Sequence, residues 1–167
     1  SNRETRKEIR IEELNEDEIR DYRVPGFRSY EIFKPFLLPL RSKVAEYPDD
    51  SWRDIEVENE KVVLLGLKGC DLAGISLLDK VFLEDPEFID PFYKKRRDSL
   101  ILISSDCMRA GDTCFCNLVG NTPYPTSDFD LNISPLSDGY LLEVGSEMGE
   151  VIVDELSLPE ADDKKIK

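Results

Sequence analysis

The clearest hydrophobic pattern in the chain lies between residues 61 and 104. Residues 61–67, KVVLLGL, form a continuous apolar run rich in β-branched side chains, and residues 99–104, SLILIS, form another. Such runs are typical of strands that are buried on both faces, and these strands belong to parallel sheets flanked by helices. We therefore expect two neighbouring strands in one sheet.

Between these two runs the apolar period changes to that of a helix. Apolar residues recur at helical spacing over residues 72–82, and Asp71 before them has the side chain of a helix N-cap. A second amphipathic stretch, FIDPFYKKRR, covers residues 88–97. A strand, crossover helix and strand of this length form a unit in which the strands are parallel in nearly all cases.

The flanking regions are less regular. Prolines divide residues 28–52 into an irregular apolar segment, in which we expect a short helix near residues 41–46. A short strand is predicted at residues 55–57. Three later segments are also predicted as strands that complete the sheet by antiparallel edge pairing, namely residues 129–134, 140–146 and 150–156.

The predicted fold class is therefore α/β, with a mixed sheet that combines a parallel β-α-β core with antiparallel edge strands. The length of 167 residues corresponds to about one domain. We assign that domain to residues 24–155. Residues 1–23 are a charged leader, whose weak pattern fits a helix or a solvated segment, and residues 156–167 are a linker or tail.

Composition narrows the classes of function. The 36 acidic and 22 basic residues give a net charge of −14, which argues against nucleic acid as a partner. No apolar run approaches the roughly 20 residues of a membrane span, and the start of the sequence has no signal-peptide core. We therefore expect a cytoplasmic protein that does not bind a membrane.

Missing residue types and motifs exclude further chemistry. The chain has no histidine, which rules out Ser-His-Asp and Cys-His catalysis and zinc held by imidazole. It also lacks GxGxxG and GxxxxGK[ST], so nothing in the sequence predicts a dinucleotide or P-loop site.

The four cysteines are predicted to share one edge of the sheet. Cys70 and Cys107 each follow an apolar strand by three residues, and the carboxyl ends of parallel strands meet at the same edge, where ligands gather. Cys114 and Cys116 follow on the loop after Cys107. We therefore expect all four thiols to converge.

Three interpretations of these cysteines remain open from the residues alone. Disulfides are rare in cytoplasmic proteins, and the CxxC motif of redox dithiols is absent. A site made only of cysteines suits either structural zinc or an iron–sulfur cluster. The third interpretation is that the site holds no metal, because a buried cysteine also behaves as a small hydrophobic residue.

Longer motifs resemble one known family. The run GLKGCDLAGISLLDKVFLEDPEFIDPFYKKRRDSLILISSDC, the later GDTCFCNLVG and the segment DFDLNISPLSDGYLLEVGSEMGE look like the amino-terminal domain of an iron–sulfur protein family. This family comprises the beta subunits of anaerobic sulfite reductases and of cytoplasmic nickel–iron hydrogenases and sulfhydrogenases. The resemblance covers residues 24–150, and its most specific parts are residues 66–72, 90–97 and 113–116.

This resemblance implies a cofactor and partners. It implies that a [4Fe–4S] cluster is bound by Cys70, Cys107, Cys114 and Cys116 in a domain that transfers electrons without catalysing a reaction of its own. It also implies partner subunits of a reductase or hydrogenase complex, including a flavin-containing subunit. Family members carry a second domain with two CxxCxxCxxxCP motifs, which this sequence lacks. We therefore expect a ferredoxin-like half to be missing.

Two other functions stay as alternatives. The first is a structural domain, with zinc or no metal, that docks a partner subunit. The second is a thiol enzyme that uses Cys70 at a helix N-terminus, although the lack of a histidine base weakens it. Near the cysteines, Phe115 is expected either to shield the site or to be a plain core aromatic. The basic run at residues 94–97 either steers an acidic partner or satisfies helix-end carbonyls.

Overall fold

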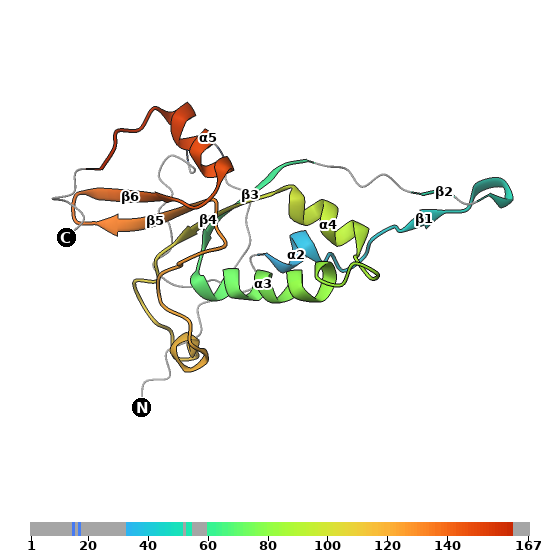
Figure 1. Cartoon of the computed structure of the whole chain (residues 1–167), viewed down its shortest axis with the longest axis horizontal. Helices are drawn as coiled ribbons and strands as arrows, with labels where there is room; N and C mark the ends of the chain where they lie inside the picture. The colour runs from blue at the N-terminus through green and yellow to red at the C-terminus, as the bar shows by residue number, and fades with distance from the viewer. Residues whose placement is uncertain (1–14, 16, 18–32, 52, 55–59, 162–167) are drawn as a thin grey trace.

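The computed structural model describes residues 15, 17, 33–51, 53–54 and 60–161 (Figure 1). All four cysteines are within these ranges. The predicted leader at 1–23 is outside them apart from Asn15 and Asp17, and the predicted strand at 55–57 is outside them entirely.

A four-stranded sheet forms the centre of the fold, with the strand order β3-β4-β5-β6 (Figure 1). Its strands are β3 (Val62–Leu67), β4 (Leu100–Ser105), β5 (Leu131–Leu136) and β6 (Gly139–Val144). The β3–β4 and β4–β5 pairs are parallel, whereas β5 and β6 pair antiparallel through a two-residue hairpin turn. This arrangement confirms the predicted mixed sheet with a parallel core.

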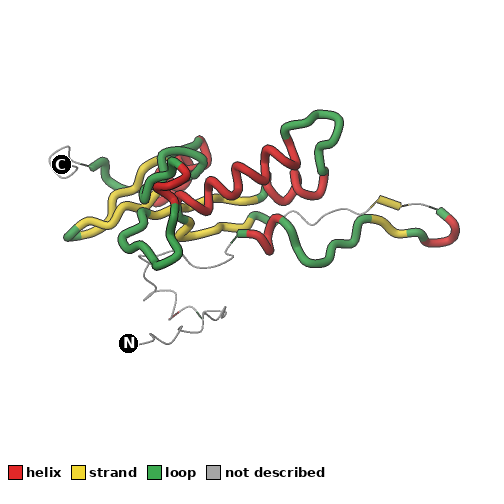
Figure 2. The backbone as a smooth tube through the Cα atoms, turned by 90° about the horizontal axis from the view of Figure 1, so that it is seen from below, coloured by secondary structure: helices red, strands yellow, loops and turns green. Residues whose placement is uncertain are grey.

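Three helices supply the apolar cover of this sheet. They are α2 (Lys34–Leu37), α3 (Gly69–Leu83) and α4 (Pro91–Asp98), the last two forming the predicted crossover between β3 and β4 (Figures 1 and 2). The core that they enclose consists of Phe33, Leu37, Leu64, Leu67, Leu72, Ile75, Tyr93, Leu100, Leu102 and Phe129. The sheet and helices therefore share one hydrophobic core.

The prediction that residues 61–67 are buried on both faces is wrong. Leu64 is buried against the helices, but Val63 and Leu65 alternate with it and are exposed, Val63 to 52%. Side chains alternate between the two faces of a strand, and the helices α2 to α4 contribute to the core on only one of them. The apolar run therefore identified the strand correctly but not the cover on its second face.

A bulge interrupts β3 just before the first turn of α3, which carries Cys70. The register with β4 shifts between Leu65 and Leu67, and Gly66 between them has a φ of +86°. This backbone conformation is open to glycine and strained for other residues. Bulges re-aim the side chains that follow them, and here Leu67 and Lys68 are both buried.

Helix α3 begins three residues earlier than the sequence predicts. Its N-cap is Lys68, and Asp71 is already the third helical residue. The Asp71 carboxylate nevertheless caps the helix, because its Oδ2 accepts a bond from the backbone N–H of Lys68 at 2.9 Å. The residue chosen as a cap therefore acts from within the first turn.

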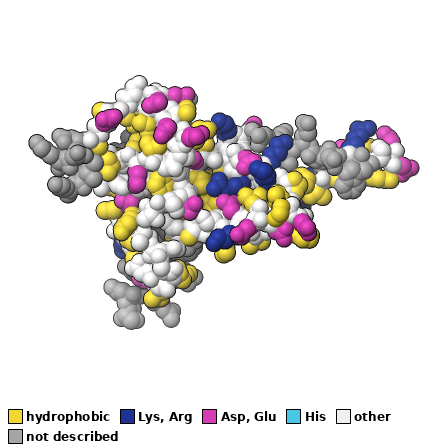
Figure 3. All heavy atoms as spheres, viewed as in Figure 1, with side chains coloured by type: hydrophobic (Ala, Val, Ile, Leu, Met, Phe, Trp, Pro, Cys, Tyr) yellow, Lys and Arg dark blue, Asp and Glu magenta, His cyan; other side chains and the backbone are white. Residues whose placement is uncertain are grey.

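Helix α4 is fixed by an N-cap and by an ion pair with α3. Asp90 Oδ1 accepts from the backbone N–H groups of Phe92 and Tyr93, and Arg97 pairs with Asp79 of α3 at 3.0 Å. The neighbouring Lys94 pairs with Asp98 one turn away. Basic side chains gather over α4 in Figure 3. Lys94 and Arg97 contact carboxylates, and the predicted bonding of residues 94–97 to helix-end carbonyls stays a prediction.

Two predicted elements are wrong. Residues 41–46 form no helix, because residues 41–44 are irregular and β1 (Ala45–Glu46) pairs with β2 (Arg53–Asp54) around a short 3-10 turn at Pro48–Asp50. This two-stranded unit extends away from the main sheet (Figures 1 and 2). Residues 150–156 belong to helix α5 (Glu147–Leu156), which Ser146 caps by accepting from the Gly149 N–H.

In the ranges that the structure describes, no helix is both long and apolar enough to cross a bilayer.

Candidate functional site

The four cysteines lie beyond the carboxyl ends of β3 and β4, one at the start of α3 and three in the segment after β4. Cys70 stands in the first turn of α3, directly after β3, and Cys107 follows β4 by two residues. Cys114 and Cys116 lie farther along the loop after β4, where Cys116 opens the 3-10 helix η2 (Cys116–Val119). No disulfide joins any of the four, all of which the structure describes.

All four cysteines line one cavity of about 520 Å³. This volume is in the range of about 300–1,000 Å³ that is typical of small-ligand sites. The wall around the cysteines is made by Lys68, Gly69, Arg109, Ala110, Gly111, Asp112, Thr113, Phe115, Val119, Asn121, Thr122 and Pro123. The structure therefore brings together the four residues that the strand order places at one edge.

The cysteine loop folds back on itself through backbone hydrogen bonds. The N–H of Cys107 donates to the carbonyl of Pro123 at 2.7 Å, which ties the start of the loop to its returning segment. The N–H of Cys114 donates to the Gly111 carbonyl at 3.1 Å, and the Gly111 N–H donates in return to the Cys114 sulfur at 3.2 Å. A backbone N–H directed at sulfur is the contact that stabilises a thiolate ligand.

A buried polar network lies beneath the cavity, across the ends of three strands. The Lys68 ammonium donates to Ser105 Oγ at 2.6 Å and to the Asp106 carbonyl at 3.1 Å. Asn132 of β5 continues the network, because its amide donates to Asp106 Oδ1 at 3.0 Å and accepts from Ser104 Oγ at 2.9 Å. This network holds the strand ends that carry the cysteine loops.

Lys68 is the charged group most affected by this environment. Burial lowers the pKa of its ammonium below the usual 10.5, while Cys107, Asp71, Asp106 and Cys70 act in the opposite direction. The side chain is only 1% exposed. A buried cation is stable only when acceptors surround it, and this one has acceptors from the end of β4. The sequence gives one weak signal for Lys68, its position between an apolar strand and a cysteine.

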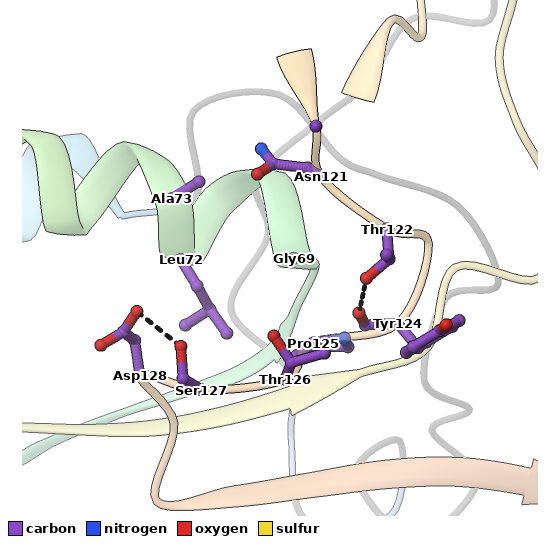
Figure 4. A pocket seen from close by; sticks show the side chains of 11 residues that line it. Gly69, Leu72, Ala73, Asn121, Thr122, Tyr124, Pro125, Thr126, Ser127 and Asp128 are labelled. Atoms are coloured by element: carbon purple, nitrogen blue, oxygen red, sulfur yellow. Dashed lines mark hydrogen bonds between the residues drawn. The ribbon is translucent and has the colours of Figure 1, made fainter. Parts of the chain in front are cut away.

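A smaller hollow of about 140 Å³ adjoins the cysteine cavity (Figure 4). It lies where residues 120–128 pass the start of α3, and both cavities share Gly69, Asn121 and Thr122. Figure 4 shows the Thr122 hydroxyl bonded to the Tyr124 carbonyl and Ser127 bonded to Asp128. These polar side chains therefore make hydrogen bonds within their own loop. The loop supports the cysteine site from one side.

Phe115 is not a core residue. It lies between Cys114 and Cys116, lines the cavity and is 58% exposed. The interpretation of Phe115 as a plain core aromatic is therefore wrong. Met108 and Val119 on the same loop are exposed as well. The cysteine cavity thus has an apolar rim rather than a buried apolar lid.

The chemistry of the donors suits a group held by sulfur, but the ligand geometry is not preformed. No cluster of three or more Cys, Asp or Glu residues in the described part of the chain is placed so that it could hold a metal ion. The donors around the cavity are four thiols, with Asp112 as the one carboxylate in its lining. A site rich in thiols fits iron–sulfur clusters and zinc, and does not fit hard cations.

Comparison with known proteins finds one informative similarity. The chain is 35% identical over 123 residues to sulfhydrogenase 2 subunit beta of Pyrococcus furiosus, an alignment that covers 73% of this chain. The chain spans only 36% of that protein. No family model and no solved structure matches the chain. The similarity supports the hydrogenase beta-subunit side of the resemblance described above.

Proposed function

We propose that this chain is an electron-transfer domain of a hydrogenase or related reductase complex, and that it holds a [4Fe–4S] cluster on Cys70, Cys107, Cys114 and Cys116. The observation that carries the proposal is that all four cysteines line a single cavity. The similarity to a sulfhydrogenase beta subunit supports the class of complex. The other subunits, including one that binds flavin, and the relation to sulfite reductases belong to this proposal.

Each group at the site would have a separate role. The four thiolates would bind iron, and a cluster held in this way supplies one-electron transfer. The Gly111 N–H, which already donates to the Cys114 sulfur, would withdraw charge from that ligand. Phe115 would limit access of water from the rim of the cavity. No residue is needed as a proton donor, which agrees with a chain that has no histidine.

The loop geometry explains how ligands can assemble although the structure shows no preformed metal group. Cys70 and Cys107 are carried by strand ends that the Lys68 network holds together. Cys114 is exposed and follows a glycine at position 111, and Cys116, which is half-buried, opens the short η2 helix. We infer that the two strand-end cysteines form the fixed half of the site and that the loop pair closes on the cluster when it binds. Metal binding commonly completes the fold of its own site.

Anaerobic purification of the full chain tests the proposal. We expect a brown protein with about four irons and four acid-labile sulfides per chain, and an electron paramagnetic resonance signal after reduction. Replacing each cysteine in turn by Ser should lower the iron content, whereas Asp112→Asn, in the same cavity, should not. Stoichiometric zinc without sulfide would refute the cluster and support a structural site. Iron content unchanged in Cys114→Ser would refute the proposed ligand set.

A further inference from the structure

Lys68 is the one cation that the described core buries, and it lies at the cysteine site. It directly follows β3, precedes Cys70 by two residues and lines the same cavity as the four cysteines. Its side chain is among the largest that are fully buried. Burying an ammonium costs several kcal/mol unless it is well paired. A residue that incurs this cost beside four thiols calls for a specific role.

The bonds of Lys68 join the two strands that carry the first two cysteines. Lys68 joins the end of β3 to the first turn of α3, which contains Cys70. Its ammonium donates to Ser105 Oγ and to the Asp106 carbonyl, which lead to Cys107. The next residue in this path, Asp106, is itself held by the Asn132 amide of β5. The ammonium therefore cross-links the start of α3 to the end of β4, at a point one or two residues from Cys70 and from Cys107.

The helix start fixes the other side of Lys68. Its backbone N–H donates to Asp71 Oδ2, and its carbonyl accepts from the N–H groups of Asp71 and Leu72. Main chain and side chain are thus both engaged, and the main-chain bonds hold the first turn of α3 that contains Cys70. The side chain enters the core rather than the solvent, after a bulge at Gly66 that shifts the register of the strand.

We infer that Lys68 is the positioning residue of the cysteine site, whose ammonium locks Cys70 and Cys107 into one arrangement and offsets the negative charge of the thiolates. The positioning of Cys70 and Cys107 does not depend on the proposed function. The offsetting of thiolate charge rests on it. Reduction adds negative charge to a cluster, and a nearby buried cation stabilises the reduced form. Lys68 would therefore raise the reduction potential of a cluster held here.

The first test is made on metal-free protein and does not depend on the cluster. Hydrogen exchange is measured for the wild type, Lys68→Met, Lys68→Gln and Lys80→Met, the last an exposed lysine of α3. We expect exchange in the peptide that contains Asp106 and Cys107 to accelerate at least tenfold in both neutral Lys68 variants. Lys80→Met should match the wild type. Unchanged exchange in the Lys68 variants would overturn the positioning role.

The second test uses anaerobically prepared protein with its iron. Potentiometric titration followed by electron paramagnetic resonance should give a more negative midpoint potential in Lys68→Gln and Lys68→Met, with the value largely restored in Lys68→Arg. An unchanged potential at equal iron content would overturn the charge role. If the wild type binds no cluster, the proposed function fails, while the exchange experiment still decides the positioning role. If Lys68→Arg folds and neither neutral variant does, Lys68 serves the whole fold, and its specific role at the cysteines is overturned.

Discussion

Asp130 and Leu102 are joined by two hydrogen bonds that meet at the centre of the sheet. The Leu102 N–H donates to Asp130 Oδ2 at 2.7 Å, and the Asp130 N–H donates to the Leu102 carbonyl at 2.8 Å. Asp130 Oδ1 also accepts from Ser146, the N-cap of α5. One side chain therefore links β4, the loop that returns from the cysteines and the last helix.

Replacing Asp130 by Ala should destabilise the domain. The buried Leu102 N–H would lose its acceptor, and the Ser146 cap would lose its partner, at a cost of about 1–3 kcal/mol in the free energy of unfolding. Urea denaturation followed by circular dichroism measures this cost. Glu143→Ala, at an exposed position of β6, is the control and should change stability by less than about 0.5 kcal/mol. Equal stability of the two variants would show that the hydrogen bonds of Asp130 do not stabilise the domain.

Gly149→Ala should also destabilise the protein, although alanine favours helices. In an open helix this change gains about 1 kcal/mol. A Cβ at Gly149 would lie 2.0 Å from the Asp130 carbonyl oxygen, and because that atom is backbone, α5 must shift. We expect a net loss of about 1–3 kcal/mol on denaturation. Gly139→Ala, whose Cβ would meet no atom within 4 Å, should be close to neutral. A stabilised Gly149→Ala would mean that α5 packs differently.

Tyr93 should make stability depend on pH in the alkaline range. Its buried hydroxyl donates to Asp79 at 2.7 Å, and burial, followed by Asp79, raises the pKa of the phenol. A raised pKa means that the folded chain keeps a proton that the unfolded chain releases. This contribution is therefore complete below a pH of about 10 and is lost as the pH rises above it.

The variant Tyr93→Phe keeps the ring that stacks on Phe82, with centroids 4.8 Å apart, and removes only the hydroxyl. We expect a loss of about 1 kcal/mol at neutral pH and a flatter decline of stability above pH ~10 than in the wild type. Denaturation at a series of pH values measures both. Tyr140→Phe, at an exposed tyrosine of β6, should keep the wild-type slope. Identical slopes in wild type and Tyr93→Phe would contradict the assignment.

Phe115→Ala tests the rim of the cysteine cavity. The side chain is exposed, so we expect the free energy of unfolding to change by less than about 0.5 kcal/mol. If Phe115 shields a cluster, iron should be lost in air several times faster than from the wild type. Leu118→Ala, on the same loop but outside the cavity lining, should behave as the wild type. Equal rates of iron loss in all three proteins would remove the shielding role.

The sequence by itself determined the parallel core and the edge at which the cysteines gather. Two apolar runs separated by helical periodicity specify a crossover unit, since local period and chain length leave few alternatives. The positions of Cys70 and Cys107 after these runs then fix their common edge. The four cysteines line one cavity at that edge, whereas their role as ligands stays a prediction.

Tertiary contacts decided the rest. Residues 150–156 contain three consecutive β-branched residues, which favour a strand, but form a helix, because Ser146 caps α5 and Asp130 holds that cap in place. The exposure of Val63 depends on which face of the sheet the helices cover, which no local pattern records. Lys68 is the sharpest case, since a lysine is normally a surface residue and only acceptors from a strand 37 residues away make its burial possible.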